Sequence, residues 1–276
     1  MKRFQQHPVF FLTQLLLFGV LINGTPTPSF AQTFEGYWEQ AGQVSSRLPV
    51  MGKTVEKQDH RIFITKDKIK TIDLTNGRTN IFRYDRKMIY RLNPGNKTYA
   101  DISFSQFESL MKRNWSRMDR MNKRLTKKLK HLKPKQRRRM IQLLGGDPAR
   151  NSRRYSKITM RWPPGLKTIL GYKCRHLQLL VNNKPFLDAY WTKAIQLPGR
   201  MLDIFNQFGY FPYKIPDHIL KLRGFPLQIT LNILYGAAKI AYQTNVTKIV
   251  RTPVSDKEFQ IPRDYRRINW TYMKLF

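Results

Sequence analysis

A long, strongly basic amphipathic helix, expected between Phe104 and Arg139, interrupts a chain that otherwise has the patterns of β-strands. Apolar residues recur along this segment in alternating steps of four and three residues, which places them on one side of a helix. They are Met111, Trp115, Met118, Leu125, Leu129 and Leu132, with Met121 beside the one vacant position, Asn122. Because such a stripe has to be covered, the rest of the fold must supply an apolar surface for it.

The other side of this helix is cationic. It carries Lys112, Arg113, Arg117, Arg120, Lys123, Arg124, Lys127, Lys128 and Lys130. We expect the helix to end near Leu132, because Pro134 cannot continue it but can begin the next helix. A second, short helix from Pro134 to Leu144 adds Arg137, Arg138 and Arg139 to the basic surface. This density of cations favours an acidic or lipid-headgroup neighbour.

The excess of basic residues extends over the whole chain. It has 51 Lys and Arg against 17 Asp and Glu, a formal net charge of +34. In a cytosolic protein this balance would indicate nucleic-acid binding. No recognisable nucleic-acid motif accompanies the charge, so nucleic acid is disfavoured as a partner. An exported protein would instead meet anionic phospholipid, lipopolysaccharide or another acidic envelope polymer.

Residues 1–31 have the pattern of an export signal. Lys2 and Arg3 precede an apolar run from Val9 to Ile22, and Ser29-Phe30-Ala31 offers a small-x-small cleavage site. The apolar run is too short for a transmembrane helix, which needs about twenty residues. We therefore expect the mature chain, residues 32–276, in the periplasm of a bacterial envelope, either soluble or peripherally attached to a membrane.

Outside the helical segment, the sequence predicts short antiparallel strands. Thr75-Asn76-Gly77-Arg78 and Asn93-Pro94-Gly95-Asn96 are turn signals between β-rich runs. Apolar and polar residues alternate from Phe225 to Tyr235, which predicts the clearest strand, and Lys239 to Val250 is expected to pair back with it. With no repeat and no low-complexity linker, we predict a single domain with a helical insertion at about residues 104–145.

The order of several short motifs resembles a bacterial exported domain of unknown function in the LolA/LolB-like lipoprotein-carrier superfamily. The motifs are Asp85-Arg86-Lys87-Met88, Asn96-Lys97-Thr98-Tyr99, Leu132-Lys133-Pro134-Lys135-Gln136-Arg137, Gly171-Tyr172-Lys173-Cys174, Tyr190-Trp191-Thr192, Gly224-Phe225-Pro226-Leu227 and Phe259-Gln260-Ile261-Pro262-Arg263-Asp264-Tyr265. The resemblance implies an α+β fold: a strongly curved antiparallel sheet, an open or half β-barrel, with a helical lid or plug on its concave face. In the carriers this hollow holds lipoprotein acyl chains, and no ligand-contacting residue can be transferred to a position here.

Two sets of helix residues are the candidate sites. Trp115, Met118, Met121, Leu125 and Leu129 form either the wall of an apolar ligand site or ordinary core that fills the concavity, and a lid helix could serve as both. The basic side chains either bind an anionic surface or keep an apolar-rich protein soluble. The leading hypothesis is a binding protein that holds a lipid or acyl chain and contacts anionic membrane. The alternative is a filled core that binds acidic surfaces by charge alone.

Catalysis is poorly supported by the sequence. Cys174 is the only cysteine, so no intramolecular disulfide can form. In a strand Cys174 and His176 would lie on one face, but the spacing shows neither a lowered thiol pKa nor a base within reach. The histidines lack metal-ligand spacing, and no glycine-rich phosphate loop occurs. We therefore expect no enzymatic activity, metal or cofactor.

Overall fold

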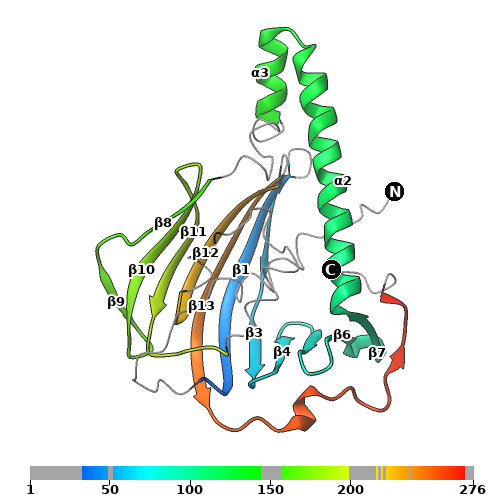
Figure 1. Ribbon diagram of the computed structural model, residues 1–276, viewed down its shortest axis with the longest axis vertical. Helices are drawn as coiled ribbons and strands as arrows, with labels where there is room; N and C mark the ends of the chain where they lie inside the picture. Colours follow the sequence, from blue (N-terminus) through cyan, green and yellow to red (C-terminus); the bar gives the residue numbers. More distant parts are fainter. Residues whose placement is uncertain are drawn as a thin grey trace.

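The computed structural model describes residues 33–48, 52–143, 157–198, 216, 219, 222–235 and 238–270. The expected export signal and Leu144, the expected last residue of the second helix, lie outside these ranges. The described chain forms one large sheet (Figure 1), and the two strands at its ends, β14 and β8, are not paired with each other. In space the strand order is β14-β7-β6-β5-β4-β3-β1-β13-β12-β11-β10-β8, with β2 also paired to β1 and β9 to β10.

The first arm of the sheet is an antiparallel meander. Its strands are β1 (Gly36–Leu48), β2 (Gly52–Lys57), β3 (His60–Ile64), β4 (Lys68–Asp73), β5 (Thr79–Arg83), β6 (Met88–Asn93) and β7 (Thr98–Ser103). Both predicted turns are found: Gly77 adopts a positive φ of 71° between β4 and β5, and Asn93 caps the short 3-10 helix η1 (Pro94–Asn96). Glycine is favoured at position 77 because a Cβ disfavours a backbone with positive φ.

The second arm is also antiparallel. It comprises β8 (Ile158–Arg161), β9 (Leu166–Ile169), β10 (Tyr172–Val181), β11 (Lys184–Thr192), β12 (Phe225–Tyr235) and β13 (Ala238–Arg251), and it joins the first arm where β13 pairs with β1. The alternating run from Phe225 to Tyr235 is therefore confirmed as a strand. The chain then crosses as η3 (Asp256–Phe259) to β14 (Arg266–Arg267), which pairs in parallel with β7, whereas the other described strands pair antiparallel.

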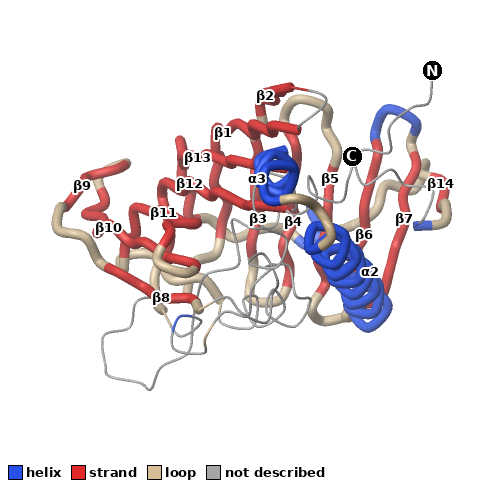
Figure 2. The backbone as a smooth tube through the Cα atoms, turned by 90° about the horizontal axis from the view of Figure 1, so that it is seen from above, coloured by secondary structure: helices blue, strands red, loops and turns tan. Residues whose placement is uncertain are grey.

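The sheet bends around one apolar face. Seen from above, the strands form an open arc (Figure 2), and register shifts interrupt three of the strand pairs, including one between Glu39 and Gln40. Such irregularities bend a strand and increase its twist. Buried residues of both arms, such as Trp38, Ile62 and Leu231, join a single core cluster. The expected α+β fold, a strongly curved and unclosed antiparallel sheet with a helix packed on it, is thus confirmed.

The predicted helical segment forms two helices, α2 (Phe104–Lys130) and α3 (Pro134–Leu143). Ser103 begins α2 with a capping box: its hydroxyl accepts from the Gln106 backbone N–H, while the Gln106 side chain accepts from the Ser103 N–H. With 27 residues α2 is about 40 Å long. It rises from β7, and its C-terminal part extends beyond the strands together with α3 (Figure 1).

Candidate functional site

The first turns of α2 belong to the core of the domain. Phe107 and Met111 are buried in the cluster that covers the inner face of the sheet, and Phe104 and Leu110 pack against that cluster. The Phe107 ring meets the indole of Trp270 edge to face, with ring centroids 6.2 Å apart. This part of α2 therefore attaches the helix to the sheet and needs no ligand to cover it.

Further along α2, the buried stripe follows strict helical spacing. Leu129 is buried and Leu125 is half-buried, whereas Met121 is 48 % exposed. Asn122 occupies the inward position instead, with only 5 % exposure, and its Oδ1 has no hydrogen-bond partner within the described structure. The alternation of four and three steps already indicated position 122. Met121 was predicted among the wall residues because it is the apolar residue next to that position.

Two of the five predicted wall residues are placed by their backbone alone. Trp115 and Met118 lie within α2, on the same spacing as Met111 and Asn122. Their side chains lie outside the described part of the structure, so an apolar ligand wall at these positions stays a prediction.

The predicted cations are all on the surface. Every one is exposed: Lys112, Arg113, Arg117, Arg120, Lys123, Arg124, Lys127, Lys128, Lys130, Arg137, Arg138 and Arg139. Lys112 forms an ion pair with Glu108 at 2.7 Å, and no other cation of α2 or α3 has an ion pair within the described residues. We call α2 and α3 together the helical hairpin. Its charge is thus almost wholly uncompensated by its own acids.

Apolar side chains lie among these cations. Besides Met121, the hairpin exposes Met140 (41 %) and Leu143 (52 %), and none of the residues of α3 is buried. A cationic helix surface with scattered exposed apolar residues is typical of elements that lie on anionic membranes. None of the described helices is long and apolar enough to cross a membrane.

The structure places Cys174 and His176 in separate environments. The buried Cys174 thiol donates to the Tyr172 carbonyl at 3.4 Å, and burial raises its pKa. His176 pairs through Nε2 with Asp188 Oδ1 at 2.6 Å and stacks on Tyr190. A cysteine nucleophile requires a lowered pKa, so the raised pKa of the Cys174 thiol is the opposite of what a nucleophile needs. No group of metal-ligating side chains occurs among the described residues.

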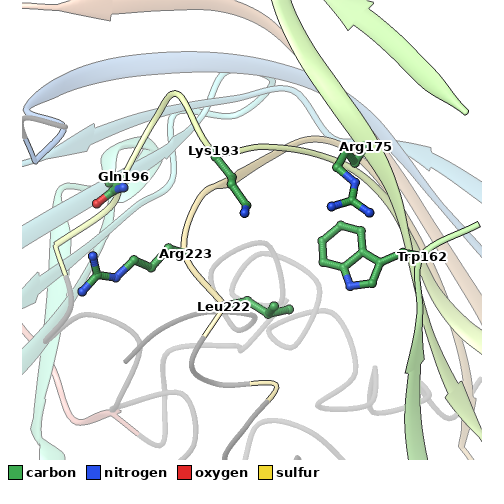
Figure 3. Close-up of a pocket in the computed structure, with 6 residues that line it drawn as sticks. All are labelled: Trp162, Arg175, Lys193, Gln196, Leu222 and Arg223. Atoms are coloured by element: carbon green, nitrogen blue, oxygen red, sulfur yellow. The ribbon is translucent and has the colours of Figure 1, made fainter. Parts of the chain in front are cut away.

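One further feature is absent from the sequence interpretation: a hollow of about 440 Å³ at the other end of the sheet. Trp162, Arg175, Lys193, Gln196, Leu222 and Arg223 line it (Figure 3). They come from four separate segments of the chain and share no motif. No sequence signal marks them, because the pairing of β8 with β10, of β10 with β11 and of β11 with β12 brings these segments together.

Solved structures that resemble this one include a protein of the LolA superfamily, the superfamily that the short motifs resemble. An uncharacterised conserved protein from Thermus thermophilus is similar with a TM-score of 0.40 and 9 % identity, covering 84 % of this chain and 90 % of that one. A LolA superfamily protein from Nitrosomonas europaea has a TM-score of 0.29 and 8 % identity, with coverage of 82 % and 90 %. A putative outer membrane lipoprotein-sorting protein domain from Vibrio parahaemolyticus has a TM-score of 0.27 and 7 % identity, with coverage of 81 % and 89 %.

No protein-family model matches the chain, and no curated protein matches it in sequence. At these TM-scores the structural likeness adds no argument about a ligand. The functional conclusion therefore depends on the side chains of this chain alone.

Proposed function

We propose that this chain is a non-enzymatic binding protein that attaches to anionic lipid surfaces through its helical hairpin. The observation that supports this function best is a surface of exposed cations with a single ion pair, on an element that extends beyond the sheet (Figure 1). A cation close to an anionic membrane contributes about 1 kcal/mol. Loss of four such cations should therefore weaken attachment to the membrane by about 4 kcal/mol.

The exposed apolar residues add a second contribution. Met121, Met140 and Leu143 can enter the boundary between headgroups and acyl chains while the neighbouring cations stay at the phosphates. Binding should therefore combine charge with a small apolar term. The charged part weakens with salt, because exposed charges are screened beyond about 3 Å at 1 M ionic strength.

Vesicle co-sedimentation with a charge-matched control tests this function. The hairpin variant carries Arg117→Gln, Arg120→Gln, Arg124→Gln and Lys128→Gln, and the body variant carries Lys173→Gln, Lys184→Gln, Lys257→Gln and Arg263→Gln. All eight residues are exposed, so both variants lose the same charge without loss of core. We expect the hairpin variant to release vesicles of anionic phospholipid and the body variant to retain them. Equal losses would show that net charge, and not the hairpin, causes the binding.

A second candidate function is the binding of a lipid or a lipoprotein acyl chain between α2 and the inner face of the sheet. It is favoured by the apolar character of that face and by the helix that packs on it. Trp115, Met118, Leu125 and Leu129 would form the wall, with Met121 outside it because of its exposure. Native mass spectrometry of gently purified protein, with organic extraction, tests this function. A protein free of lipid that also takes up no fluorescent fatty acid would exclude it.

Residence in a bacterial periplasm is part of the same proposal. It is supported by the export-signal pattern of residues 1–31 and by the acidic surfaces that an envelope offers to a basic protein. Cell fractionation with N-terminal sequencing checks it, and a mature chain that begins at Gln32 is the expected result.

A further inference from the structure

The hollow at the β8–β10 end of the sheet has the size of a small-molecule site. Its volume of about 440 Å³ falls within the range of about 300 to 1,000 Å³ found for ligand pockets. Trp162 follows β8, Arg175 lies in β10, Lys193 follows β11, and Leu222 and Arg223 precede β12. In strand order these elements lie at the end of the sheet opposite to β7, from which α2 begins. The hollow is therefore separate from the helical hairpin.

The lining of the hollow divides into cations and apolar groups. Arg175, Lys193 and Arg223 are basic, Gln196 is neutral, and no acid is among the described lining residues. In Figure 3 the Lys193 ammonium points into the space between the Arg175–Trp162 pair and Arg223, with Leu222 facing it. Trp162 and Leu222 both pack against the main core. A concave site lined by charges of one sign concentrates ions of the opposite sign.

Several contacts hold these walls in place. The Arg175 guanidinium lies 4.8 Å from the centroid of the Trp162 ring, an attractive cation–π arrangement. The Arg223 carbonyl accepts a hydrogen bond of 2.9 Å from Trp191 Nε1, and the Gln196 carbonyl accepts one of 2.7 Å from the Phe34 N–H. These contacts hold the Arg175–Trp162 pair and the backbone at Gln196 and Arg223 in place, which reduces the ordering entropy that binding costs.

We propose that this hollow binds an oxyanion, of phosphate or carboxylate type, that is attached to an apolar body. The oxyanion lies between Arg175 and Lys193, where a guanidinium can donate two parallel hydrogen bonds to it. The apolar body lies against Trp162 and Leu222, at the edge of the core. A lipid headgroup and a soluble phosphorylated or carboxylated compound share this chemistry. The site does not depend on attachment of the hairpin to membranes.

Titration calorimetry at about 0.15 M salt tests the site with three probes. They are a single-chain lysophosphatidic acid below its micelle concentration, the uncharged monoacylglycerol of the same chain, and inorganic phosphate. We expect the lysophosphatidic acid to bind at least about tenfold more tightly than the monoacylglycerol. The substitution Arg175→Gln should lower the affinity for the lysophosphatidic acid by roughly tenfold or more. Lys184→Gln, which removes an exposed cation elsewhere on β11, is the matched control and should leave the affinity unchanged.

The outcomes separate the two sources of the oxyanion. Binding of the lysophosphatidic acid alone assigns the hollow to a lipid headgroup, whereas additional binding of inorganic phosphate assigns it to free oxyanions as well. Equal affinity for the charged and the uncharged chain would overturn the proposal, as would equal effects of Arg175→Gln and Lys184→Gln. Thermal unfolding followed by circular dichroism confirms that each variant is folded.

The hairpin variant keeps this test independent of the proposed function. The hairpin variant should no longer bind anionic vesicles, and it should still bind the lysophosphatidic acid with the affinity of the unmodified protein. Loss of the lysophosphatidic acid in the hairpin variant, with no effect of Arg175→Gln, would place the anion site on the hairpin and refute the hollow.

Discussion

The helical hairpin and the hollow use the same side chains in opposite geometries. On the hairpin, the predicted Lys and Arg side chains are all exposed on the surface of the helices. In the hollow, Arg175, Lys193 and Arg223 line one concavity beside Trp162. Exposed cations on a convex helix attract any extended acidic surface, without selecting its shape. Cations that share a concavity can select a single group by its size and charge. The comparison shows that charge composition alone does not distinguish these two kinds of site.

The largest expected effect is that of salt. We expect an increase of NaCl from about 0.1 to about 1 M to abolish vesicle binding by the hairpin and to weaken lysophosphatidic acid binding by the hollow far less. Exposed charges are almost fully screened at the higher concentration, whereas the apolar contact of the acyl chain with the half-buried Trp162 and Leu222 is not weakened by screening. Co-sedimentation and calorimetry across a salt series measure the two slopes. Parallel slopes would mean that both regions bind as exposed surfaces.

Gly224→Ala should damage the hollow and leave the hairpin intact. A Cβ at this position, where φ is +130°, would lie 2.2 Å from Trp191 Nε1 and 2.3 Å from the Thr192 carbonyl oxygen. We expect a loss of roughly 2 to 4 kcal/mol in the free energy of unfolding, measured by chemical denaturation. The lysophosphatidic acid affinity should fall as well, because the Arg223 backbone shifts with Trp191.

Gly165→Ala is the matched control for this substitution. Gly165 has a similar φ of +120°, but no atom lies within 4 Å of the added Cβ. The backbone strain is then comparable and the clash is missing, so the loss should be smaller. A loss as large as that of Gly224→Ala would trace the effect to φ alone and remove the argument for a fixed wall.

Asn122→Leu tests the buried side of the hairpin. The substitution removes a buried amide oxygen that has no hydrogen-bond partner within the described structure, and Leu favours a helix more than Asn. We expect the free energy of unfolding to rise by about 1 kcal/mol in thermal or chemical denaturation. A decrease would show that the Asn122 amide has a binding role inside the fold.

Met121→Gln has the smallest expected effect and separates membrane contact from packing. Because Met121 is 48 % exposed, its replacement should change the free energy of unfolding by less than about 0.5 kcal/mol. Affinity for anionic vesicles should fall by about two- to fivefold, since part of the apolar contact is lost. A clear loss of stability would place Met121 in the core, as its apolar character alone suggested.

Local sequence signals marked several elements of this fold. Alternation over Phe225–Tyr235 marks a strand because side chains point to opposite faces every second residue. The break before Pro134 separates α2 from α3 because proline cannot continue a helix. The same spacing places Asn122 on the buried side of α2 and the apolar Met121 outside it, because the geometry of a helix and not side-chain polarity decides which position points inward.

The sequence by itself determined the strand pair of β12 and β13, the two helices and the outward charge of the hairpin, since each follows from local periodicity and local chemistry. Only the tertiary structure decided how far the sheet bends, which part of α2 joins the core, and that Trp162, Arg175, Lys193 and Arg223 surround one hollow. These contacts connect residues that are distant along the chain. Their placement depends on strand register and packing across the whole sheet, which no local pattern encodes.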